Sequence, residues 1–355
     1  MINVLIVNDS PTAAEFLREI LGSDPEISVT GTARNGIEAV KMAAVKKPDV
    51  IAMDVHMPGL DGFETTRRIM ENTPVPIVIV AGSSLKDDDL LVFKAVQAGA
   101  VASVRAPSGF SAPEHARQAA ELVSTIKTMA EVKVVKRWSR VIARPAAGIS
   151  APAKLAVTRP GIIELVAIGA STGGPVVLQA ILSRLPAGLS APIVVVQHMS
   201  PGFIESFAKW LGESASLKVS IASHEETALP GHVYVAPEGR HLTVGRGPLM
   251  RLVDGEPENG MRPSVSRLFR SVAEDFGKNS AGILLTGMGE DGAKGLKTMR
   301  DAGAVTIAQD EETSLINGMP GAAVRTGAAA YVLPPEGIAA AISALAPDKT
   351  TGGSV

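Results

Sequence analysis

Cysteine is absent from the 355-residue chain. Its absence excludes disulfide bonds, thiol catalysis and metal sites built from thiolates, and it is compatible with a reducing compartment. Aromatic residues are also scarce, at 3% of the chain. The core must therefore be built mainly from aliphatic side chains and methionine.

Neither charge nor hydropathy points to nucleic acid or to a membrane. The formal net charge is only −2, so the strong basic field that nucleic-acid binding needs is missing. No run reaches the roughly 18 uninterrupted apolar residues of a membrane span. The N-terminal stretch MINVLIVNDSPT lacks the basic start and long apolar run of a signal peptide. We expect a cytoplasmic protein with no membrane insertion and no nucleic-acid partner.

Apolar runs of strand length alternate with amphipathic stretches in two separate sets. The first set occupies residues 1–128 and the second residues 161–347. Residues 129–160 between them are basic and rich in proline and alanine, which indicates a linker, and residues 348–355 are expected to be a disordered tail. The alternation predicts two α/β domains, each a doubly wound parallel sheet with helices on both faces.

Acidic side chains follow two strands of the first set. The first apolar run ends in Asn8-Asp9, and the third ends in Asp54. Because the carboxyl ends of parallel strands meet at one edge of a sheet, we expect these carboxylates to lie close together. Clustered oxygens suit Mg²⁺, and a carboxylate beside Mg²⁺ can accept a phosphoryl group. Carboxylates at such positions also commonly cap helices, and the spacing alone does not decide between the two roles.

Four segments of the first domain resemble a response-regulator receiver domain: VLIVNDSPT, DVHMPGLDGFETTRRI, PVPIVIV and AGAVASVRAP. The resemblance covers residues 1 to about 125 and implies a flavodoxin-like fold. It also implies that Asp54 is the phosphoacceptor. Asp9, Asp54 and the carbonyl of His56 would then be the ligands of Mg²⁺.

Three positions depart from the receiver pattern. Asn8 stands where the family usually has an acid, Ala81 where it has a serine or threonine, and Ala106 where it has a lysine. The lysine normally contacts the phosphate and the hydroxyl normally reorients toward it, so their loss removes much of the switch. Arg105 or Ser83 could take over these roles from offset positions. We therefore expect only a weak response to phosphorylation.

The strongest local motif of the second domain is LVAIGASTGGPVVLQAIL. Ser171 stands in a G-x-S-x-G sequence between a strand and a helix, the context of a nucleophile elbow. The flanking glycines permit a tight turn, and the helix N-terminus offers unpaired N–H groups to a developing oxyanion. A glycine-rich loop could instead hold a dinucleotide phosphate, but GASTGG lacks the G-x-G-x-x-G spacing.

A serine nucleophile needs a base, and two further strand ends offer one base and one acid. His198 follows the run PIVVVQ, and Asp291 lies in GMGEDG after the run AGILLT. Ser171, His198 and Asp291 can therefore converge as nucleophile, general base and orienting acid. Glu290 is the alternative acid. The other histidines of this domain are expected to be structural or at the surface: His224, His232 and His241.

Six segments of the second domain are similar, in order, to the CheB-type protein-glutamate methylesterase family: IGASTGG, VVVQHMSPGF, ALPGHVYVAPEGRHL, RPSVSRLF, GILLTGMGEDGAKGL and TIAQDEETSLINGMP. The match covers residues from about 160 to 345 and implies a Rossmann-like domain. It implies the same three roles for Ser171, His198 and Asp291, and it assigns Thr172 and Met288 to the surroundings of the oxyanion. No cofactor is implied for the esterase site.

The resemblance implies hydrolysis of glutamate γ-methyl esters on the cytoplasmic domains of methylated chemoreceptors, with deamidation of receptor glutamines as a second reaction. A chemotaxis histidine kinase would be the partner of the receiver, and in the family the receiver covers the active-site face. Two alternatives remain open: an esterase with a non-chemotaxis substrate, and a regulated signalling adaptor without catalysis. A transcription factor is not expected, because no basic helix-turn-helix segment is evident.

Overall fold

The computed structural model describes residues 1–82, 88–132, 134 and 163–348. The chain divides into two compact units, Met1–Pro145 and Ala146–Val355. The expected linker at residues 129–160 falls mostly outside the described residues, as does the expected tail except for its first residue. The last helix of the first unit continues to Ala130, two residues beyond the expected end of the domain.

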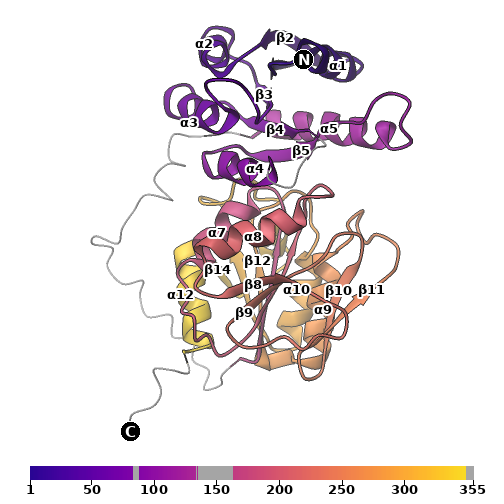
Figure 1. The fold of residues 1–355 in the computed structure, drawn as a ribbon. Helices are drawn as coiled ribbons and strands as arrows, with labels where there is room; N and C mark the ends of the chain where they lie inside the picture. Colours follow the sequence, from indigo (N-terminus) through magenta and orange to yellow (C-terminus); the bar gives the residue numbers. More distant parts are fainter. Residues whose placement is uncertain (83–87, 133, 135–162, 349–355) are drawn as a thin grey trace. The chain divides into compact units, whose positions relative to one another are not determined.

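The first unit is a five-stranded parallel sheet in the order β2-β1-β3-β4-β5 (Figure 1). Its strands are β1 (Ile2–Val7), β2 (Ile27–Ala33), β3 (Val50–Met53), β4 (Ile77–Ala81) and β5 (Ala102–Arg105). Its helices are α1 (Pro11–Gly22), α2 (Gly36–Lys46), α3 (Gly62–Asn72), α4 (Asp88–Gln97) and α5 (His115–Ala130). Helices α1 and α5 pack together, and α2, α3 and α4 pack in sequence as a second layer. This is the flavodoxin-like strand order that the sequence predicts.

Side-chain caps begin three of these helices. Ser10, Asn35 and Asp61 each precede a helix, and each accepts a hydrogen bond from the backbone N–H three residues later, at 3.3, 2.9 and 2.7 Å. Such caps satisfy N–H groups that a helix leaves unpaired at its first turn.

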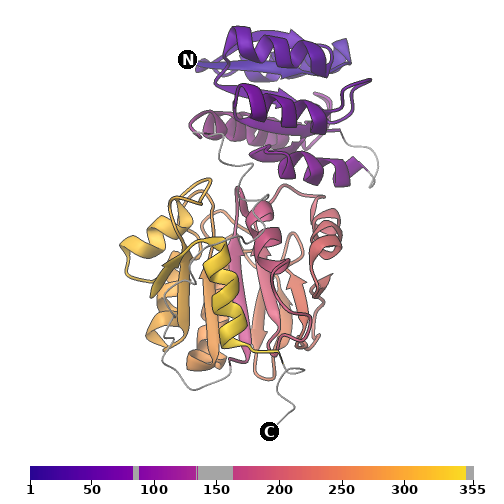
Figure 2. The ribbon, with the colours of Figure 1, turned by 90° about the vertical axis from the view of Figure 1, so that its left-hand side faces the viewer.

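The second unit is built on a seven-stranded parallel sheet in the order β14-β13-β12-β6-β7-β9-β8 (Figure 2). Its strands are β6 (Leu165–Ala170), β7 (Ile193–Gln197), β8 (Lys218–Ile221), β9 (His232–Val235), β12 (Ser280–Leu284), β13 (Val305–Gln309) and β14 (Tyr331–Leu333). An antiparallel hairpin is added by β10 (His241–Gly245) and β11 (Leu249–Val253). The sheet confirms the doubly wound architecture predicted from the sequence.

Two helical layers cover this sheet. Helices α7 (Gly174–Leu182), α8 (Ile204–Ser214) and α12 (Pro335–Leu345) pack together. Helices α9 (Val265–Asp275), α10 (Ala293–Asp301) and α11 (Met319–Arg325) form the other group, with the hairpin against α9 and the short 3₁₀ turn η1 (Gly277–Asn279) after it. The core between sheet and helices is mainly aliphatic, as the scarcity of aromatic residues predicts.

The centre of the sheet aligns three strand ends. Strand β6 pairs with β7 on one side, where Ala170 is opposite Gln197, and with β12 on the other, where Gly169 is opposite Leu284. Because the three strands are parallel and in register, the residues that follow them emerge at the same edge. Ligands bind at this kind of edge in doubly wound sheets.

Close packing brings helix α9 against the central strand. A Cβ placed on Gly169 would lie only 2.1 Å from Cγ1 of Val265, the first residue of α9. Only glycine therefore permits this approach without moving the helix. The approach carries the N-terminus of α9 to the carboxyl edge of β6.

The elements that the sequence did not reveal lie away from this centre. Strands β8 and β14 are short and stand at the two edges of the sheet, and β8 also contains polar residues. The hairpin β10–β11 also went unrecognised. None of these differences alters the order of the strands that surround β6.

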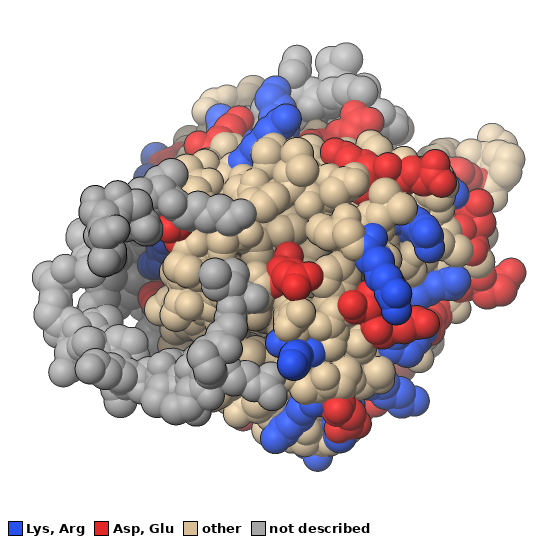
Figure 3. Space-filling model, turned by 90° about the horizontal axis from the view of Figure 1, so that it is seen from below, with Lys and Arg blue, Asp and Glu red and all other residues tan. Residues whose placement is uncertain are grey.

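Within the ranges the structure describes, no helix is long and apolar enough to cross a bilayer. The face of the molecule in Figure 3 shows acidic and basic side chains interspersed around an area that carries few charges. Neither the acidic nor the basic side chains form a large patch of their own on that face, in agreement with the small net charge.

We predict that a fragment of residues 163–348 folds without the first unit, because it has its own sheet and core. Its thermal unfolding, followed by circular dichroism, should be cooperative, with a Tm within about 4 °C of the matching transition in the full chain. A broad, non-cooperative transition would show that the second unit depends on the rest of the chain.

Candidate active site

Ser171 lies in the turn between β6 and α7. The strand ends at Ala170 and the helix begins at Gly174, which leaves three residues for the reversal. Gly173 has φ of 80°, a left-handed conformation that glycine adopts without strain. The turn is closed by a hydrogen bond from the Gly174 N–H to the Ser171 carbonyl, at 2.8 Å. This is the strand–turn–helix context that the sequence motif predicts.

The backbone of Ser171 is held on both sides. Its N–H donates to the carbonyl of Thr286 at 3.0 Å, so this N–H is not available to an oxyanion. Gly287 packs directly against the serine, since a Cβ there would lie 2.6 Å from the Ser171 Cβ. The segment after β12 therefore forms one wall of the site.

His198 follows β7 beside Ser171. Its N–H donates to the carbonyl of Ala170 at 2.9 Å, which fixes the two strand ends next to each other. The His198 Nε2 lies 3.1 Å from Asp291 Oδ2. Neither buried ring nitrogen makes an aligned hydrogen bond within the described residues, so this contact is a close pair of groups rather than a well-directed bond. With Nε2 facing the acid, Nδ1 is the nitrogen left for a serine proton.

Asp291 lies at the N-terminus of helix α9, although it is distant in sequence. Its carboxylate accepts hydrogen bonds from the backbone N–H groups of Val265 (2.7 Å), Ser266 (3.1 Å) and Gly292 (2.9 Å), and from the hydroxyl of Ser264 (3.1 Å). The positive end of the helix dipole adds to these donors. A carboxylate with only 4% of its residue surface exposed is thus fully hydrogen-bonded.

These partners set the ionisation of Asp291. Burial alone would raise the pKa of the carboxyl, but the contacts with His198 and Ser266 and the bond from the Val265 N–H outweigh it and hold the pKa well below its usual range. Asp291 is therefore an anion at neutral pH. An anion therefore faces the His198 ring at 3.1 Å.

The alternative acid, Glu290, points elsewhere. Its carboxylate pairs with Arg325 at 3.4 Å, and its side chain is largely exposed. Of the two neighbouring acids, only Asp291 contacts His198.

Gln197 is a site residue that the sequence did not single out. It is the last residue of β7 and is 3% exposed. Its side-chain Nε2 donates to two carbonyls, those of Ser171 at 2.8 Å and His198 at 2.7 Å. One amide thus ties the backbone of the serine to that of the histidine. The available signal was a polar residue that ends an otherwise apolar, buried strand.

His241 and Ser264 were also not assigned to the site. His241 was expected to be structural or at the surface, and it is fully buried at the start of β10. It accepts from the Ser264 N–H through Nδ1 at 3.2 Å, and its Nε2 contacts the Glu256 carbonyl at 3.0 Å. These two bonds define the neutral tautomer with the proton on Nε2. The ring supports Ser264, whose hydroxyl reaches Asp291.

Thr172 follows Ser171 in the turn, and Met288 follows Gly287, which packs against the serine. The Thr172 carbonyl accepts from the Thr286 hydroxyl at 3.0 Å. Met288 follows Gly287 and has an exposed side chain. In the described part of the chain, no hydrogen bond engages the backbone N–H of either residue. Two donors are therefore available beside Ser171.

In the first unit, the predicted acidic cluster lies at the carboxyl edge of the sheet. Asp54 follows β3, which pairs with β1, and its N–H donates to the Val7 carbonyl at 2.9 Å. Burial raises the pKa of Asp54, and the negative charge of Asp9 raises it further. The hydrogen bond from the His56 N–H lowers the pKa and so opposes this rise. A cation between Asp9 and Asp54 would relieve this repulsion, and two carboxylates with a carbonyl are suitable ligands for Mg²⁺.

Asn8 changes this cluster. Its side-chain amide donates to Asp54 Oδ2 at 2.9 Å, while its Oδ1 accepts from the Ser10 N–H at 2.9 Å. The position therefore presents a donor to Asp54 instead of a third acid. Among the described residues, no group of three or more histidine, cysteine, aspartate or glutamate side chains could hold a metal.

The two other unusual positions lie together at neighbouring strand ends. Ala81 ends β4 and Ala106 follows β5, and the Ala106 N–H donates to the Ala81 carbonyl at 2.8 Å. Arg105, one candidate replacement, donates through Nη1 to the Gly82 carbonyl at 3.1 Å. The other candidate, Ser83, lies outside the described residues.

Comparison with known proteins matches both units. A family model described as CheB methylesterase matches residues 166–342, and one described as response regulator receiver domain matches residues 4–112. A protein-glutamate methylesterase/protein-glutamine glutaminase of Geobacter metallireducens is 49% identical over 98% of this chain and 100% of its own length. A protein of the same description from Syntrophus aciditrophicus is 50% identical over 98% of this chain and 99% of its own.

One solved structure resembles the second unit. The catalytic domain of the Thermotoga maritima CheB methylesterase aligns with a TM-score of 0.50 and 39% identity, over 52% of this chain and 98% of that one.

We predict that Gln197→Met slows catalysis without weakening substrate binding. Methionine keeps the length of the side chain but cannot hold the Ser171 and His198 carbonyls. A small displacement of reacting groups costs up to about 10²-fold in rate, so kcat for ester hydrolysis should fall about 10- to 100-fold with KM nearly unchanged.

The matched control is Gln118→Met in the first unit, where the same change removes bonds from Ser108. It should leave kcat as in the wild type. A normal kcat in Gln197→Met, or a loss carried by KM alone, would contradict a positioning role for Gln197.

Proposed function

The chain belongs to the CheB-type family of receiver-linked protein-glutamate methylesterases/protein-glutamine glutaminases, and we propose from its geometry how it carries out that reaction. It is a carboxylic ester hydrolase with a response-regulator receiver domain. The observation that carries the proposed mechanism is the His198–Asp291 pair at the strand end next to Ser171.

Acylation begins with Ser171. Its Oγ attacks the γ-carbonyl carbon of the esterified glutamate while His198 Nδ1 accepts the hydroxyl proton. Asp291 stabilises the resulting imidazolium, since its carboxylate is ionised and held in place by the N-terminus of α9. The tetrahedral intermediate collapses, the C–OCH₃ bond breaks, and the imidazolium gives its proton to the leaving oxygen to release methanol.

Deacylation reverses the proton transfers. Water attacks the γ-glutamyl ester of Ser171, His198 takes a proton from the water, and the C–Oγ bond breaks as Ser171 recovers its proton. The products are glutamate and free enzyme. A glutamine side chain follows the same route with ammonia as the leaving group, which accounts for both reactions in the name of the relatives.

The negative oxygen of both tetrahedral intermediates needs donors. The Ser171 N–H is bonded to Thr286, so the backbone N–H groups of Thr172 and Met288 are the candidates. Preorganised donors of this kind contribute about 2.7–4 kcal/mol each to transition-state stabilisation. No metal ion or cofactor takes part in this scheme.

For the receiver, we propose phosphorylation at Asp54 with Mg²⁺ held by Asp9, Asp54 and the carbonyl of His56. Mg²⁺, when bound, neutralises charge on the incoming phosphoryl group. Asn8 donates to Asp54 and leaves one carboxylate fewer for the ion.

We propose the cytoplasm as the location and a chemotaxis histidine kinase as the phosphoryl donor. The substrates would be methylated cytoplasmic domains of chemoreceptors. The full-length match to methylesterases supports these assignments. It also favours catalysis over the non-catalytic adaptor.

Ser171→Ala should lower methanol release from methylated receptor membranes by at least about three powers of ten, because it removes the nucleophile. His198→Ala should show a similar loss, and the double variant should be little worse than either single one, since both disable one proton transfer. Methanol release is measured by gas–liquid partition of a labelled methyl group. If the loss of activity in the double variant equalled the product of the two single losses, the two residues would act separately.

Deleting residues 1–140 should raise methanol release, because a fused receiver that regulates an esterase must lower its activity in one state. A coupling between sites typically changes activity about 5- to 150-fold. The comparison requires a truncated protein with a cooperative thermal transition. Unchanged or lower release from a folded fragment would assign the receiver to recruiting a partner instead.

Phosphorylation should activate the wild type only slightly, on the order of twofold, because a switch needs contacts that differ between its two states. Ala106 offers no cation and Ala81 no hydroxyl to the phosphoryl group. Restoring them in the variant Asn8→Asp/Ala81→Thr/Ala106→Lys should raise the response to at least about fivefold.

The measurement is methanol release against acetyl phosphate concentration, with Asp54→Ala as the blank. A large wild-type response that Asp54→Ala abolishes would show that other residues fill the missing roles.

A further inference from the structure

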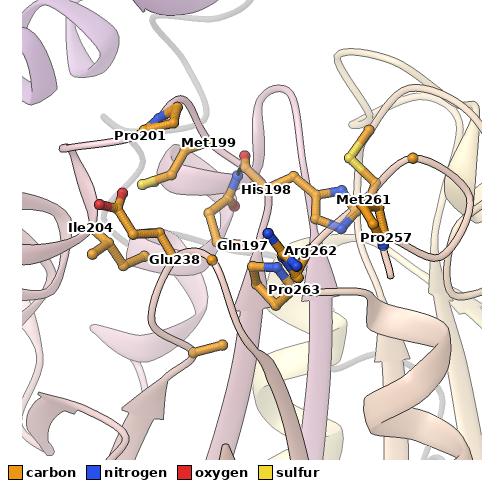
Figure 4. Close-up of a pocket in the computed structure, with 13 residues that line it drawn as sticks. Gln197, His198, Met199, Pro201, Ile204, Glu238, Pro257, Met261, Arg262 and Pro263 are labelled. Carbon is orange, nitrogen blue, oxygen red and sulfur yellow. Dashed lines mark hydrogen bonds between the residues drawn. The ribbon is translucent and has the colours of Figure 1, made fainter. Parts of the chain in front are cut away.

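A pocket of about 310 Å³ opens beside His198, the proposed general base (Figure 4). Gln197 and His198 form part of its lining, so it is continuous with the place where the ester must bind. A second wall comes from the loop between β11 and α9, and a third from the segment after β9, which supplies Ala236, Glu238 and Gly239. None of these lining groups other than Gln197 and His198 has a role in the hydrolytic steps.

The interior of the pocket is apolar. Ile204, Ala236 and Pro263 are buried beneath it. Two methionines from different loops, Met199 and Met261, add side chains that are partly exposed. Met261 is 37% exposed, which leaves apolar surface to be covered. A ligand with an apolar group would gain about 25 cal/mol for each Å² it buries here.

Charges of both signs lie at the rim. Glu238 is exposed and accepts a hydrogen bond from the Gly202 N–H at 2.6 Å, and Arg262 is exposed and donates through Nη1 to the Gly255 carbonyl at 2.8 Å. Figure 4 shows the two side chains entering from different loops. An apolar floor with a polar rim is the usual composition of a protein-binding subsite.

We propose that this pocket is a substrate subsite that takes an apolar side chain next to the esterified glutamate in the substrate protein. The proposal rests on the proposed function and names a determinant of its specificity. The methoxy group that leaves has only two heavy atoms, whereas the pocket volume is at the lower end of the roughly 300–1,000 Å³ range of ligand sites. The pocket therefore has room for a whole side chain beyond the reacting group.

Methionine at two walls suits a site that accepts more than one sequence. The unbranched thioether side chain adapts its shape to different apolar partners, and methionine-rich surfaces are common in proteins that bind several targets. Met199 and Met261 would thus let one active site serve esters in different sequence surroundings.

The first test is Met261→Asp in the full chain. Placing a carboxylate on the wall should lower kcat/KM on methylated receptor membranes at least about tenfold relative to the rate at which a fluorophosphonate labels Ser171. The fluorophosphonate is small and reports the triad alone. The matched control is Leu229→Asp, because Leu229 is an apolar residue of the same unit with 51% exposure outside the pocket. In Leu229→Asp, the ratio of kcat/KM on receptor membranes to the labelling rate of Ser171 should equal that of the wild type.

The second test uses the absence of cysteine from the chain. Met261→Cys, combined with Ser171→Ala to preserve the ester, carries a single thiol. Receptors with one cysteine at each position flanking a methylated glutamate are then mixed with it under mild oxidation. A disulfide should form with a flanking position, and Leu229→Cys/Ser171→Ala should form none.

An unchanged ratio in Met261→Asp, or equal cross-linking of both cysteine variants, would overturn the subsite. If wild-type Ser171 also failed to react with the fluorophosphonate, the proposed mechanism would fail with it. If Ser171 reacted normally, only the subsite would be rejected.

Discussion

The buried carboxylate of Asp291 depends on the N-terminus of helix α9. A carboxylate placed among apolar residues would normally take up a proton, because burial disfavours its charged form. Here the first N–H groups of α9, which have no partner within the helix, donate to it, and the hydroxyl of Ser264 completes the shell. The helix end and the acid therefore satisfy each other, and the acid remains an anion that can hold the ring of His198.

This arrangement requires α9 to reach the edge of the sheet. The missing Cβ at Gly169 allows Val265 to pack against β6, which places the helix N-terminus beside the ends of β6 and β7. The side-chain amide of Gln197 donates hydrogen bonds to the carbonyls of Ser171 and His198. On the side of β12, the Thr286 carbonyl accepts a hydrogen bond from the Ser171 N–H. Ser171 and His198 are thus fixed by backbone hydrogen bonds to neighbouring strand ends, and Asp291 is fixed by the N-terminus of α9. The side chains that react need little reorganisation, which is what an esterase gains from a rigid sheet edge.

Much of the fold could be predicted from the sequence, because apolar runs and strand-end motifs are local signals. The two doubly wound parallel sheets and the positions of Ser171, His198 and Asp291 after strands follow from such signals, and the catalytic roles of these three residues stay predictions. The order of the strands about β6 was not predicted, because it depends on pairing between segments that are distant in sequence. Gln197, His241 and Ser264 could not be identified, since a buried amide or imidazole acquires a role only through the groups that face it in three dimensions. The edge strands β8 and β14 were missed because they are only four and three residues long, and β8 is also partly polar. The two units differ in how completely they match their family patterns: the G-x-S-x-G motif of the second unit is complete, whereas Asn8, Ala81 and Ala106 depart from the receiver pattern in the first.

The central claim is that Ser171 is the nucleophile activated by His198. The most direct measurement is mass spectrometry of peptides from the full-length protein after reaction with a fluorophosphonate. The account predicts one adduct per chain, located on Ser171, and a labelling rate that falls by at least about 10³ when His198 is replaced by alanine. An adduct on another residue, or an enzyme that releases methanol at its full rate while Ser171 carries the label, would contradict it.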